Sequence, residues 1–198
     1  DKEGFCSVIM EGRGLPAKAA FPDSFSYGNE AVETVSYDPE GAKKLLEESG
    51  WKDTDGDGCA DKDGQKLTID WLTYPTRLEQ PKLAEYAQAT LKEIGIDVVV
   101  NNTSDHMTYA ADGNFDVYVS STTTAPTGDP EYFFTTHCLD SSAVNNGHYH
   151  SDKLEQLEKE MAKTFDTERR SELAVEMQQT ILDDNAFVFC SHLKMSMI

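Results

Sequence analysis

The sequence has few basic residues, and this scarcity limits the partners that it can bind. Its 17 lysines and arginines stand against 36 aspartates and glutamates, which gives a formal net charge of −19. Nucleic-acid binding requires a basic surface that neutralises phosphates. We therefore expect no nucleic-acid partner and attribute most of the acidic residues to a solvated surface that keeps the protein soluble.

The sequence also lacks the motifs that mark common enzyme classes. It contains no G-x-S-x-G, no P-loop and no G-x-G-x-x-G after a predicted strand, which leaves no sign of a serine hydrolase or a nucleotide-binding enzyme. No apolar run approaches the roughly 18–20 residues that a membrane-spanning helix requires. We therefore predict a protein that is not an enzyme and that requires no cofactor.

Cysteine is scarce, and its four copies are scattered through the chain. Cys6, Cys59, Cys138 and Cys190 include no C-x-x-C pair. Their spacing supports neither a zinc knuckle nor a dense disulfide framework. We expect mostly buried free thiols, with a single long-range disulfide as the alternative, and cysteine usage does not identify the cellular compartment.

Hydrophobic periodicity and end signals predict an α/β fold. Two predicted strands, residues 66–74 and 96–100, flank a predicted helix at 79–94, which implies a parallel strand–helix–strand unit. The other expected elements are helices over 1–11, 38–50, 104–111, 129–134, 151–163 and 166–182, strands over 115–120 and 187–190, and an ordered surface loop over 15–37. We predict one α/β lobe with a mixed sheet flanked by helices.

A polar loop follows the third predicted strand, at residues 120–128, which we call the ligand loop. Loops at the carboxyl ends of strands in open α/β sheets are where such folds hold small ligands. The ligand loop contains Thr122, Thr123 and Thr124, and it places no nucleophile beside a base. We therefore predict that these three residues bind a ligand and do not carry out chemistry.

Several blocks of the sequence resemble one family. Tyr37-Asp-Pro-Glu-Gly-Ala-Lys-Lys-Leu-Leu-Glu-Glu-Ser-Gly-Trp51 resembles the "Y-D-P-x-x-A-K-x-L-L-x-x-A-G-W" block of extracytoplasmic solute-binding proteins of peptide/nickel ABC transporters. Thr164-Phe-Asp-Thr-Glu-Arg-Arg170 is similar to the "T-x-D-x-x-x-R" block of that family. The resemblance covers essentially the whole chain and implies a periplasmic-binding-protein-like fold.

The resemblance also implies how the protein works and where. Members of this family have two lobes joined by a hinge, and they trap a small ligand between the lobes. Residues 1–198 resemble the C-terminal ligand-binding lobe, so we expect the N-terminal lobe to lie outside this chain. The implied partner is an ABC transporter permease. The implied location is extracytoplasmic, in the periplasm or on the outer face of the cell membrane, with a lipid anchor outside this chain.

The identity of the ligand rests on two blocks. Tyr74-Pro-Thr-Arg-Leu-Glu-Gln-Pro81 is similar to the "Y-x-x-R-x-E-x-P" block of the nickel-type branch. Peptide-binding members often carry an aspartate in the ligand loop that holds the peptide's amino group, whereas this chain has no acid there before Asp129. We therefore favour nickel, carried as a small chelate, over an oligopeptide or dipeptide, which remains the alternative.

This choice of ligand makes three side chains candidates for the binding site. His137 is a candidate because neutral imidazole is a usual protein ligand for nickel; its alternative is a hydrogen-bonded surface histidine. Arg77 follows a predicted strand, where its guanidinium would bind a carboxylate of the chelator; its alternative is an ion pair with Glu79 or Glu85. Tyr27 is a candidate for the pocket wall.

An aspartate-rich loop separates the first long helix from the first predicted strand. Asp53, Asp55 and Asp57 match D-x-D-x-D-G, in which carboxylates surround Ca²⁺, and Asp61 adds a fourth. Position 12 of the motif is Gly64 and not the bidentate glutamate, so calcium affinity should be low. The alternative is a connector whose aspartates and glycines form turns. This loop leaves a third possible function, a calcium-stabilised extracellular interaction module.

Overall fold

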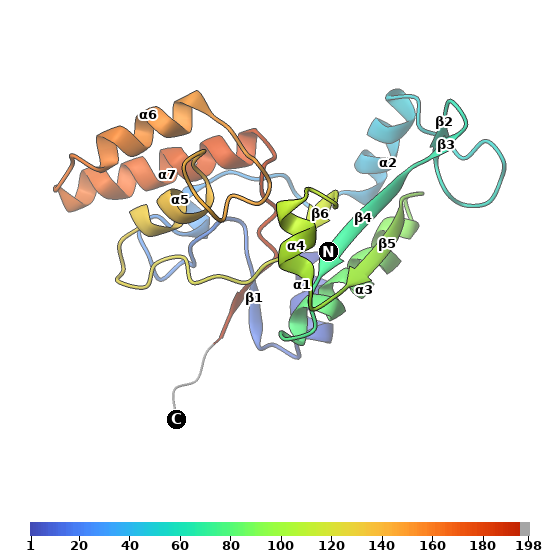
Figure 1. Ribbon diagram of the computed structural model, residues 1–198, viewed down its shortest axis with the longest axis horizontal. Helices are drawn as coiled ribbons and strands as arrows, with labels where there is room; N and C mark the ends of the chain where they lie inside the picture. The colour runs from blue at the N-terminus through green and yellow to red at the C-terminus, as the bar shows by residue number, and fades with distance from the viewer. Residues whose placement is uncertain (195–198) are drawn as a thin grey trace. The chain divides into compact units, whose positions relative to one another are not determined.

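The computed structural model describes residues 1–194, which form two compact units (Figure 1). Unit 1 consists of Asp1 and Ser36–Ser121. Unit 2 consists of Lys2–Val35 and the described residues from Thr122 onward. The ligand loop therefore begins in unit 1 and continues in unit 2, because the chain passes from one to the other between Ser121 and Thr122.

Unit 1 is built on a three-stranded parallel sheet. Strand β4 (Thr68–Thr73) lies between β5 (Asp97–Asn102) and β6 (Val117–Tyr118), and both neighbours run parallel to it. Helix α3 (Glu79–Lys92) connects β4 to β5. The predicted parallel strand–helix–strand unit is therefore confirmed, although β6 is shorter than expected.

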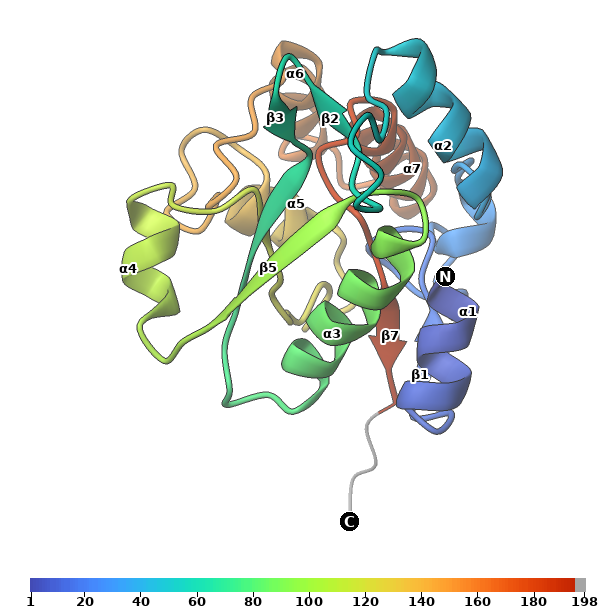
Figure 2. The same cartoon turned by 90° about the vertical axis from the view of Figure 1, so that its right-hand side faces the viewer.

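Helix α3 covers one face of this sheet (Figure 2). Trp71 of β4, Val98 of β5 and Ala84 of α3 form the buried centre of the contact. Side chains alternate between the faces of a strand, so the opposite face carries Asp70 and Leu72 of β4. Each fully buried large aliphatic or aromatic side chain stabilises the fold by about 1.5–3 kcal/mol.

Local end signals set the remaining elements of unit 1. Helix α2 (Pro39–Glu48) begins where predicted, because the Asp38 carboxylate accepts a hydrogen bond from the Gly41 amide at 2.9 Å. The other elements are the hairpin of β2 (Asp61–Lys62) and β3 (Gln65–Lys66) and the short helix α4 (His106–Ala111).

Unit 2 is mostly helical. Its helices α6 (Asp152–Met161) and α7 (Thr167–Asp183) pack side by side, and α5 (Glu131–His137) packs against α6 (Figure 1). A short antiparallel ladder joins β1 (Gly14–Pro16) to β7 (Ser191–Leu193). The chain enters unit 2 through α1 (Lys2–Gly4) and a π-helical segment, Phe5–Ile9, and has a 3-10 turn at Asn29–Ala31.

The core of unit 2 corrects one expectation about residues 15–37. They were expected to run over a surface, but the structure buries Ala19, Phe21 and Tyr27, which are at most 5% exposed. Phe21 packs edge-to-face on Phe133 and Phe134 of α5. A segment without regular periodicity can therefore supply core side chains, because its irregular backbone places each aromatic ring individually.

The predicted strand over residues 187–190 is wrong. Phe187 and Phe189 stack on one another and pack against Phe133, so their alternation serves ring packing and not strand pairing. The strand begins at Ser191 instead, where β1 provides backbone partners.

The structure holds all four cysteines as free thiols, with Cys6 and Cys138 buried. Cys59 and Cys190 are partly exposed, so the burial that was expected for most of the cysteines holds for two. Burial raises the pKa of the Cys138 thiol. Among the described residues, no helix is long and apolar enough to cross a membrane.

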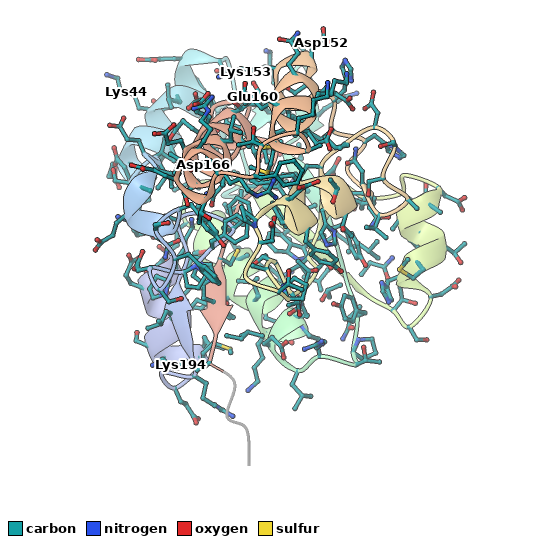
Figure 3. The ribbon with its side chains drawn as sticks, turned by 90° about the vertical axis from the view of Figure 1, so that its left-hand side faces the viewer. Lys44, Asp152, Lys153, Glu160, Asp166 and Lys194 are labelled. Atoms are coloured by element: carbon teal, nitrogen blue, oxygen red, sulfur yellow. The ribbon has the colours of Figure 1, made fainter. Side chains whose placement is uncertain are left out.

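Helix α7 depends on its N-cap. The Asp166 carboxylate accepts a hydrogen bond from the Arg169 amide at 2.9 Å, and it lies at the solvent-facing start of the helix (Figure 3). Asp166→Ala is expected to lower the free energy of unfolding by about 1 kcal/mol. Urea unfolding followed by circular dichroism measures this loss, with the nearby exposed Lys163→Ala as a control that should change little. Equal effects of the two substitutions would contradict the capping role.

Candidate ligand-binding site

A threonine and a histidine meet beside the ligand loop. The Thr122 hydroxyl lies 2.9 Å from Nε2 of His137, the last residue of α5. The imidazole ring also packs against Phe133, with ring centroids 5.6 Å apart. The structure thus brings together two predicted site residues that are 15 positions apart in the sequence.

The surroundings of His137 favour a neutral imidazole. Partial burial lowers the pKa of His137 below its ordinary value, which favours the neutral form of the ring over the protonated form. When Nε2–H donates to the Thr122 hydroxyl, Nδ1 keeps its lone pair and can bind a metal ion. A histidine in this tautomer, oriented by a second side chain, has the arrangement that metal-binding histidines usually show.

The remainder of the ligand loop offers hydroxyl groups but no free carboxylate. Thr123 is exposed and Thr124 is partly buried. Asp129, the first acid after the loop, is bound through both carboxylate oxygens by Nη2 of Arg170, at 2.7 and 2.8 Å. Asp129 is therefore already paired within unit 2.

Tyr27 contacts the end of the ligand loop from the core of unit 2. It is 5% exposed, stacks on Phe25 and packs edge-to-face against Phe21. Its hydroxyl donates a hydrogen bond to the Gly128 carbonyl at 2.7 Å. The structure thus places Tyr27 in the core of unit 2 as an anchor for the end of the loop.

Unit 1 contains an aromatic cluster that the sequence did not reveal. The His106 ring stacks on Tyr74, with centroids 4.2 Å apart, and its Nδ1 lies 2.8 Å from the Tyr118 hydroxyl. The Tyr74 hydroxyl accepts a hydrogen bond from the Ser121 amide at 3.4 Å, at the start of the ligand loop. The one feature of the sequence that could have indicated this cluster is that Tyr74 and Tyr118 each stand at or near the carboxyl end of a predicted strand.

Arg77 lies between β4 and α3 and is exposed. Within residues 1–194 its side chain forms no ion pair, so the alternative pairing with Glu79 or Glu85 is not present. Arg77 belongs to unit 1, whereas His137 belongs to unit 2.

The aspartate-rich loop gathers three of its four predicted carboxylates. Asp53, Asp55 and Asp61 place carboxylate oxygens within 4.8 Å of one another. Asp57 does not join them, because its carboxylate pairs with the Lys66 ammonium group. Asp53 accepts hydrogen bonds from two backbone amides of the loop, and Asp61 accepts them from Thr54. These bonds form the turns of the connector, and calcium binding here stays a prediction.

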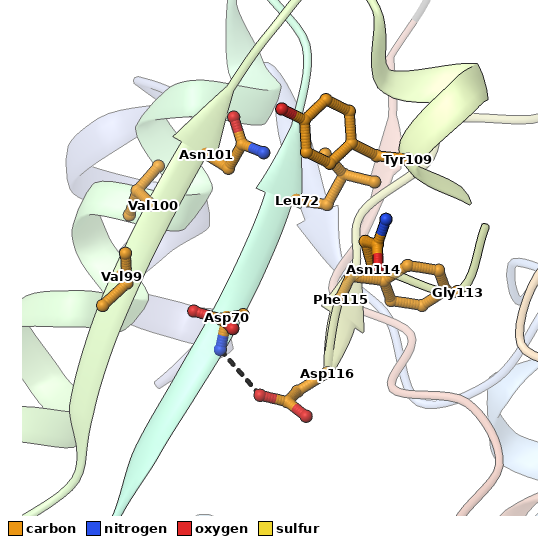
Figure 4. Close-up of a pocket in the computed structure, with 10 residues that line it drawn as sticks. All are labelled: Asp70, Leu72, Val99, Val100, Asn101, Tyr109, Gly113, Asn114, Phe115 and Asp116. Atoms are coloured by element: carbon orange, nitrogen blue, oxygen red, sulfur yellow. Dashed lines mark hydrogen bonds between the residues drawn. The ribbon is translucent and has the colours of Figure 1, made fainter. Parts of the chain in front are cut away.

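A separate groove of about 700 Å³ lies on the face of the unit 1 sheet that α3 leaves uncovered (Figure 4). Its lining combines apolar, carboxamide and carboxylate side chains, and the Asp116 carboxylate accepts a hydrogen bond from the Asp70 amide at 2.8 Å. Asp70, Leu72, Val99, Val100, Asn101, Tyr109, Gly113, Asn114, Phe115 and Asp116 line it. None of the predicted site residues lies in this groove.

The lowered pKa values of two partly buried histidines of unit 2 predict how the stability of the fold depends on pH. Burial lowers the pKa of His137 and of His192 below the ordinary value near 6.5. The unfolded chain then binds more protons than the folded chain just below pH 6.5, so stability falls as the pH drops through that window. Melting temperatures between pH 7.5 and 5 should decrease, and less steeply in His137→Gln. An unchanged slope in this variant would contradict the assignment.

The parallel sheet of unit 1, followed by a polar loop after its third strand, is typical of open α/β folds that hold small ligands. A family model for bacterial extracellular solute-binding proteins, family 5 Middle, matches residues 1–145. The chain therefore belongs to this family. The family is one of solute-binding proteins and not of enzymes, which confirms the prediction that this protein is not an enzyme.

Two curated relatives differ in the ligand that their names give. The nickel-binding protein NikA of Staphylococcus aureus is 27% identical over 175 residues, which are 88% of this chain and 33% of the relative. The oligopeptide-binding protein AppA of Bacillus subtilis is 37% identical over 100 residues, which are 50% of this chain and 18% of the relative. This chain thus spans at most about a third of the length of either relative.

Solved structures of these two proteins share the fold. NikA from Staphylococcus aureus in complex with Ni(L-His)2 has a TM-score of 0.82 at 24% identity, covering 96% of this chain and 39% of that chain. AppA from Bacillus subtilis in complex with a nonapeptide has a TM-score of 0.83 at 24% identity, covering 98% and 39%. The similarity confirms the predicted α/β, binding-protein-like fold. The two TM-scores are nearly equal, so they do not distinguish a nickel ligand from a peptide ligand.

Proposed function

We propose that this chain belongs to the substrate-binding component of an ABC importer that captures nickel as a small chelate and delivers it to a membrane permease. Two lobes close around the ligand about a hinge, and the closed form is the one that the permease recognises. We place the protein outside the cytoplasm, held at the membrane by a lipid anchor outside this chain. Membership of an extracellular solute-binding family supports this proposal.

The pairing of Thr122 with His137 is the observation that most favours nickel. A neutral, partly buried imidazole is a good ligand for nickel and a poor one for an ammonium group. Peptide capture through the amino terminus needs a fixed carboxylate in a dry site, and Asp129 is already held by Arg170. The nickel-binding name of a relative that aligns over 88% of this chain points the same way.

Each predicted site residue has a role in this proposal. His137 binds the metal through Nδ1, and the hydroxyl groups of Thr122, Thr123 and Thr124 donate hydrogen bonds to the chelator. Arg77, which is exposed and unpaired among the described residues, binds a carboxylate of the chelator. Tyr27 contributes by holding Gly128 and thus the shape of the ligand loop.

Peptide capture is the second candidate function, and two observations favour it. The oligopeptide-binding relative reaches 37% identity over half of this chain. The stacked pair of buried Tyr74 and partly buried His106 also lies at the start of the ligand loop, where the Ser121 amide donates to Tyr74, and aromatic rings are groups that peptide side chains contact. Family membership favours solute capture over the calcium-stabilised interaction module that the aspartate-rich loop suggested.

Calorimetric titration of the complete natural polypeptide, purified free of ligand, tests the proposal. Nickel ions alone, nickel with excess L-histidine and a mixed pool of short peptides are titrated separately. Nickel with histidine should bind most tightly, and the peptides should give no heat of binding. Binding of peptides alone would overturn the choice of ligand and keep the transport role, whereas no binding in any titration would overturn both.

A further inference from the structure

One arginine of α7 connects three separate parts of unit 2. The Arg170 side chain is 14% exposed, and its Nη2 donates to both Asp129 oxygens and to Oε2 of Glu131 at 2.7 Å. Its Nη1 donates to the carbonyl groups of Met161, the last residue of α6, and of Thr164, at 2.7 and 2.9 Å. Arg170 therefore joins α7, the C-terminal end of α6 and the chain that follows the ligand loop.

Besides Arg170, Tyr27 and the loop's own turn hold the end of the ligand loop. Gly128 accepts the Tyr27 hydroxyl at 2.7 Å and donates its own amide to the Ala125 carbonyl at 3.1 Å. Asp129 accepts the Glu131 amide at 2.9 Å, which starts helix α5. The Asp129 side chain is thus the point at which the loop is fixed to the helix carrying His137, and Arg170 holds that side chain.

The surroundings of this contact are acidic. Asp129 and Glu131 are two residues apart, and Glu131 also helps to raise the pKa of Glu158, after the effect of burial. Arg170 is the cation that balances these carboxylates in the contact. The Arg170 side chain is mostly buried, whereas that of Asp129 is 44% exposed. Removing one partner therefore loosens this contact locally but costs less than breaking a fully buried ion pair.

We propose that Arg170 is a positioning residue for the ligand loop. By holding Asp129 through both oxygens, it fixes where residues 120–128 turn into α5, and so fixes Thr122 relative to His137. It also keeps the carboxylate nearest to the loop from binding an amino group of a ligand. This inference deepens the proposed function, on which its effect on affinity rests.

The adjacent arginine provides a matched control. Arg169 is also on α7, but it is directed to Glu160, Glu172 and Glu176 and makes no contact with the loop. Arg170→Gln and Asp129→Asn are therefore compared with Arg169→Gln in the complete natural polypeptide. Asp129→Asn is the milder change, because Arg170 keeps Glu131 and two carbonyl groups as partners.

Hydrogen–deuterium exchange of the ligand-free protein is the first readout. Arg170→Gln and Asp129→Asn should each speed amide exchange in residues 121–131 by at least about tenfold, because the loop opens locally more often. The double variant should add little to either single change, since both remove the same contact. Exchange that matches the Arg169→Gln control, or additive effects, would overturn the inference, whether or not any ligand binds.

Affinity for nickel with L-histidine is the second readout. Both loop variants should bind about tenfold more weakly, as supporting residues of metal sites usually do when altered. Faster loop exchange with unchanged affinity would overturn the role of Arg170 in binding. Failure of the unaltered protein to bind would overturn the proposed function instead, and the exchange result would still decide the structural part.

Discussion

Phe21→Ala is expected to lower the free energy of unfolding by about 3–5 kcal/mol, the loss typical of a large aromatic removed from a packed core. The Phe21 side chain is completely buried and packs edge-to-face on Tyr27, Phe133 and Phe134. Its removal leaves a cavity beside the Tyr27 ring, whose hydroxyl donates a hydrogen bond to the Gly128 carbonyl. Urea unfolding followed by circular dichroism gives the free energy.

An exposed phenylalanine supplies the control for this experiment. Phe165 lies between α6 and α7 and is 91% exposed, so Phe165→Ala should change stability by no more than about 0.5 kcal/mol. A similar loss for both substitutions would contradict the assignment of the core to residues 15–37 and α5.

His137→Ala is expected to weaken binding of nickel with L-histidine by about 100-fold, which corresponds to about 2.7 kcal/mol. The imidazole is the proposed metal ligand, and no other histidine contacts Thr122 among the described residues. Thr122→Ala should weaken binding by about tenfold, because it removes the group that orients the ring. Competition calorimetry or a metal-sensitive dye measures both changes.

His150 provides the matched control for His137. It is exposed, lies 2.7 Å from the Asp140 carboxylate, and follows the loop before α6. His150→Ala should leave nickel affinity unchanged while removing the same type of side chain. Equal losses for His137→Ala and His150→Ala would indicate unspecific metal binding and contradict the site.

Local signals predicted most of the elements. Asp38 with Pro39, Ser151 and Asp166 each cap the helix that they were expected to begin. The apolar period of α3 and the β-branched run of β5 similarly predicted the parallel unit that the structure confirms. These signals work because caps and periodicity act within one or two turns of the chain.

What could not be predicted depends on contacts between distant residues. Asp129 and Arg170 are 41 positions apart, so nothing near either residue indicated their pairing. Phe187 and Phe189 alternate as a strand would, but their rings pack on Phe133 instead. Burial of Phe21 likewise depends on α5, which is more than a hundred residues further along the chain.

The candidate site was predicted in part. Sequence reasoning selected Thr122 and His137 separately, and the structure shows that they are hydrogen-bonded. It did not find the cluster of Tyr74, His106 and Tyr118, because no motif links the ends of two paired parallel strands to the first residue of α4. Ligand binding by all of the predicted site residues stays a prediction: Thr122, Thr123, Thr124, His137, Arg77 and Tyr27.

Anomalous diffraction at the nickel absorption edge is the most direct test of nickel binding at His137. The complete natural polypeptide would be crystallised with nickel and L-histidine, and the anomalous difference map would locate the metal. If His137 binds the metal, the map should show one strong peak about 2.1 Å from its Nδ1, the usual distance between a metal and an imidazole nitrogen. A peak at the aspartate-rich loop alone, or peptide density beside the ligand loop without a metal, would contradict nickel binding at His137.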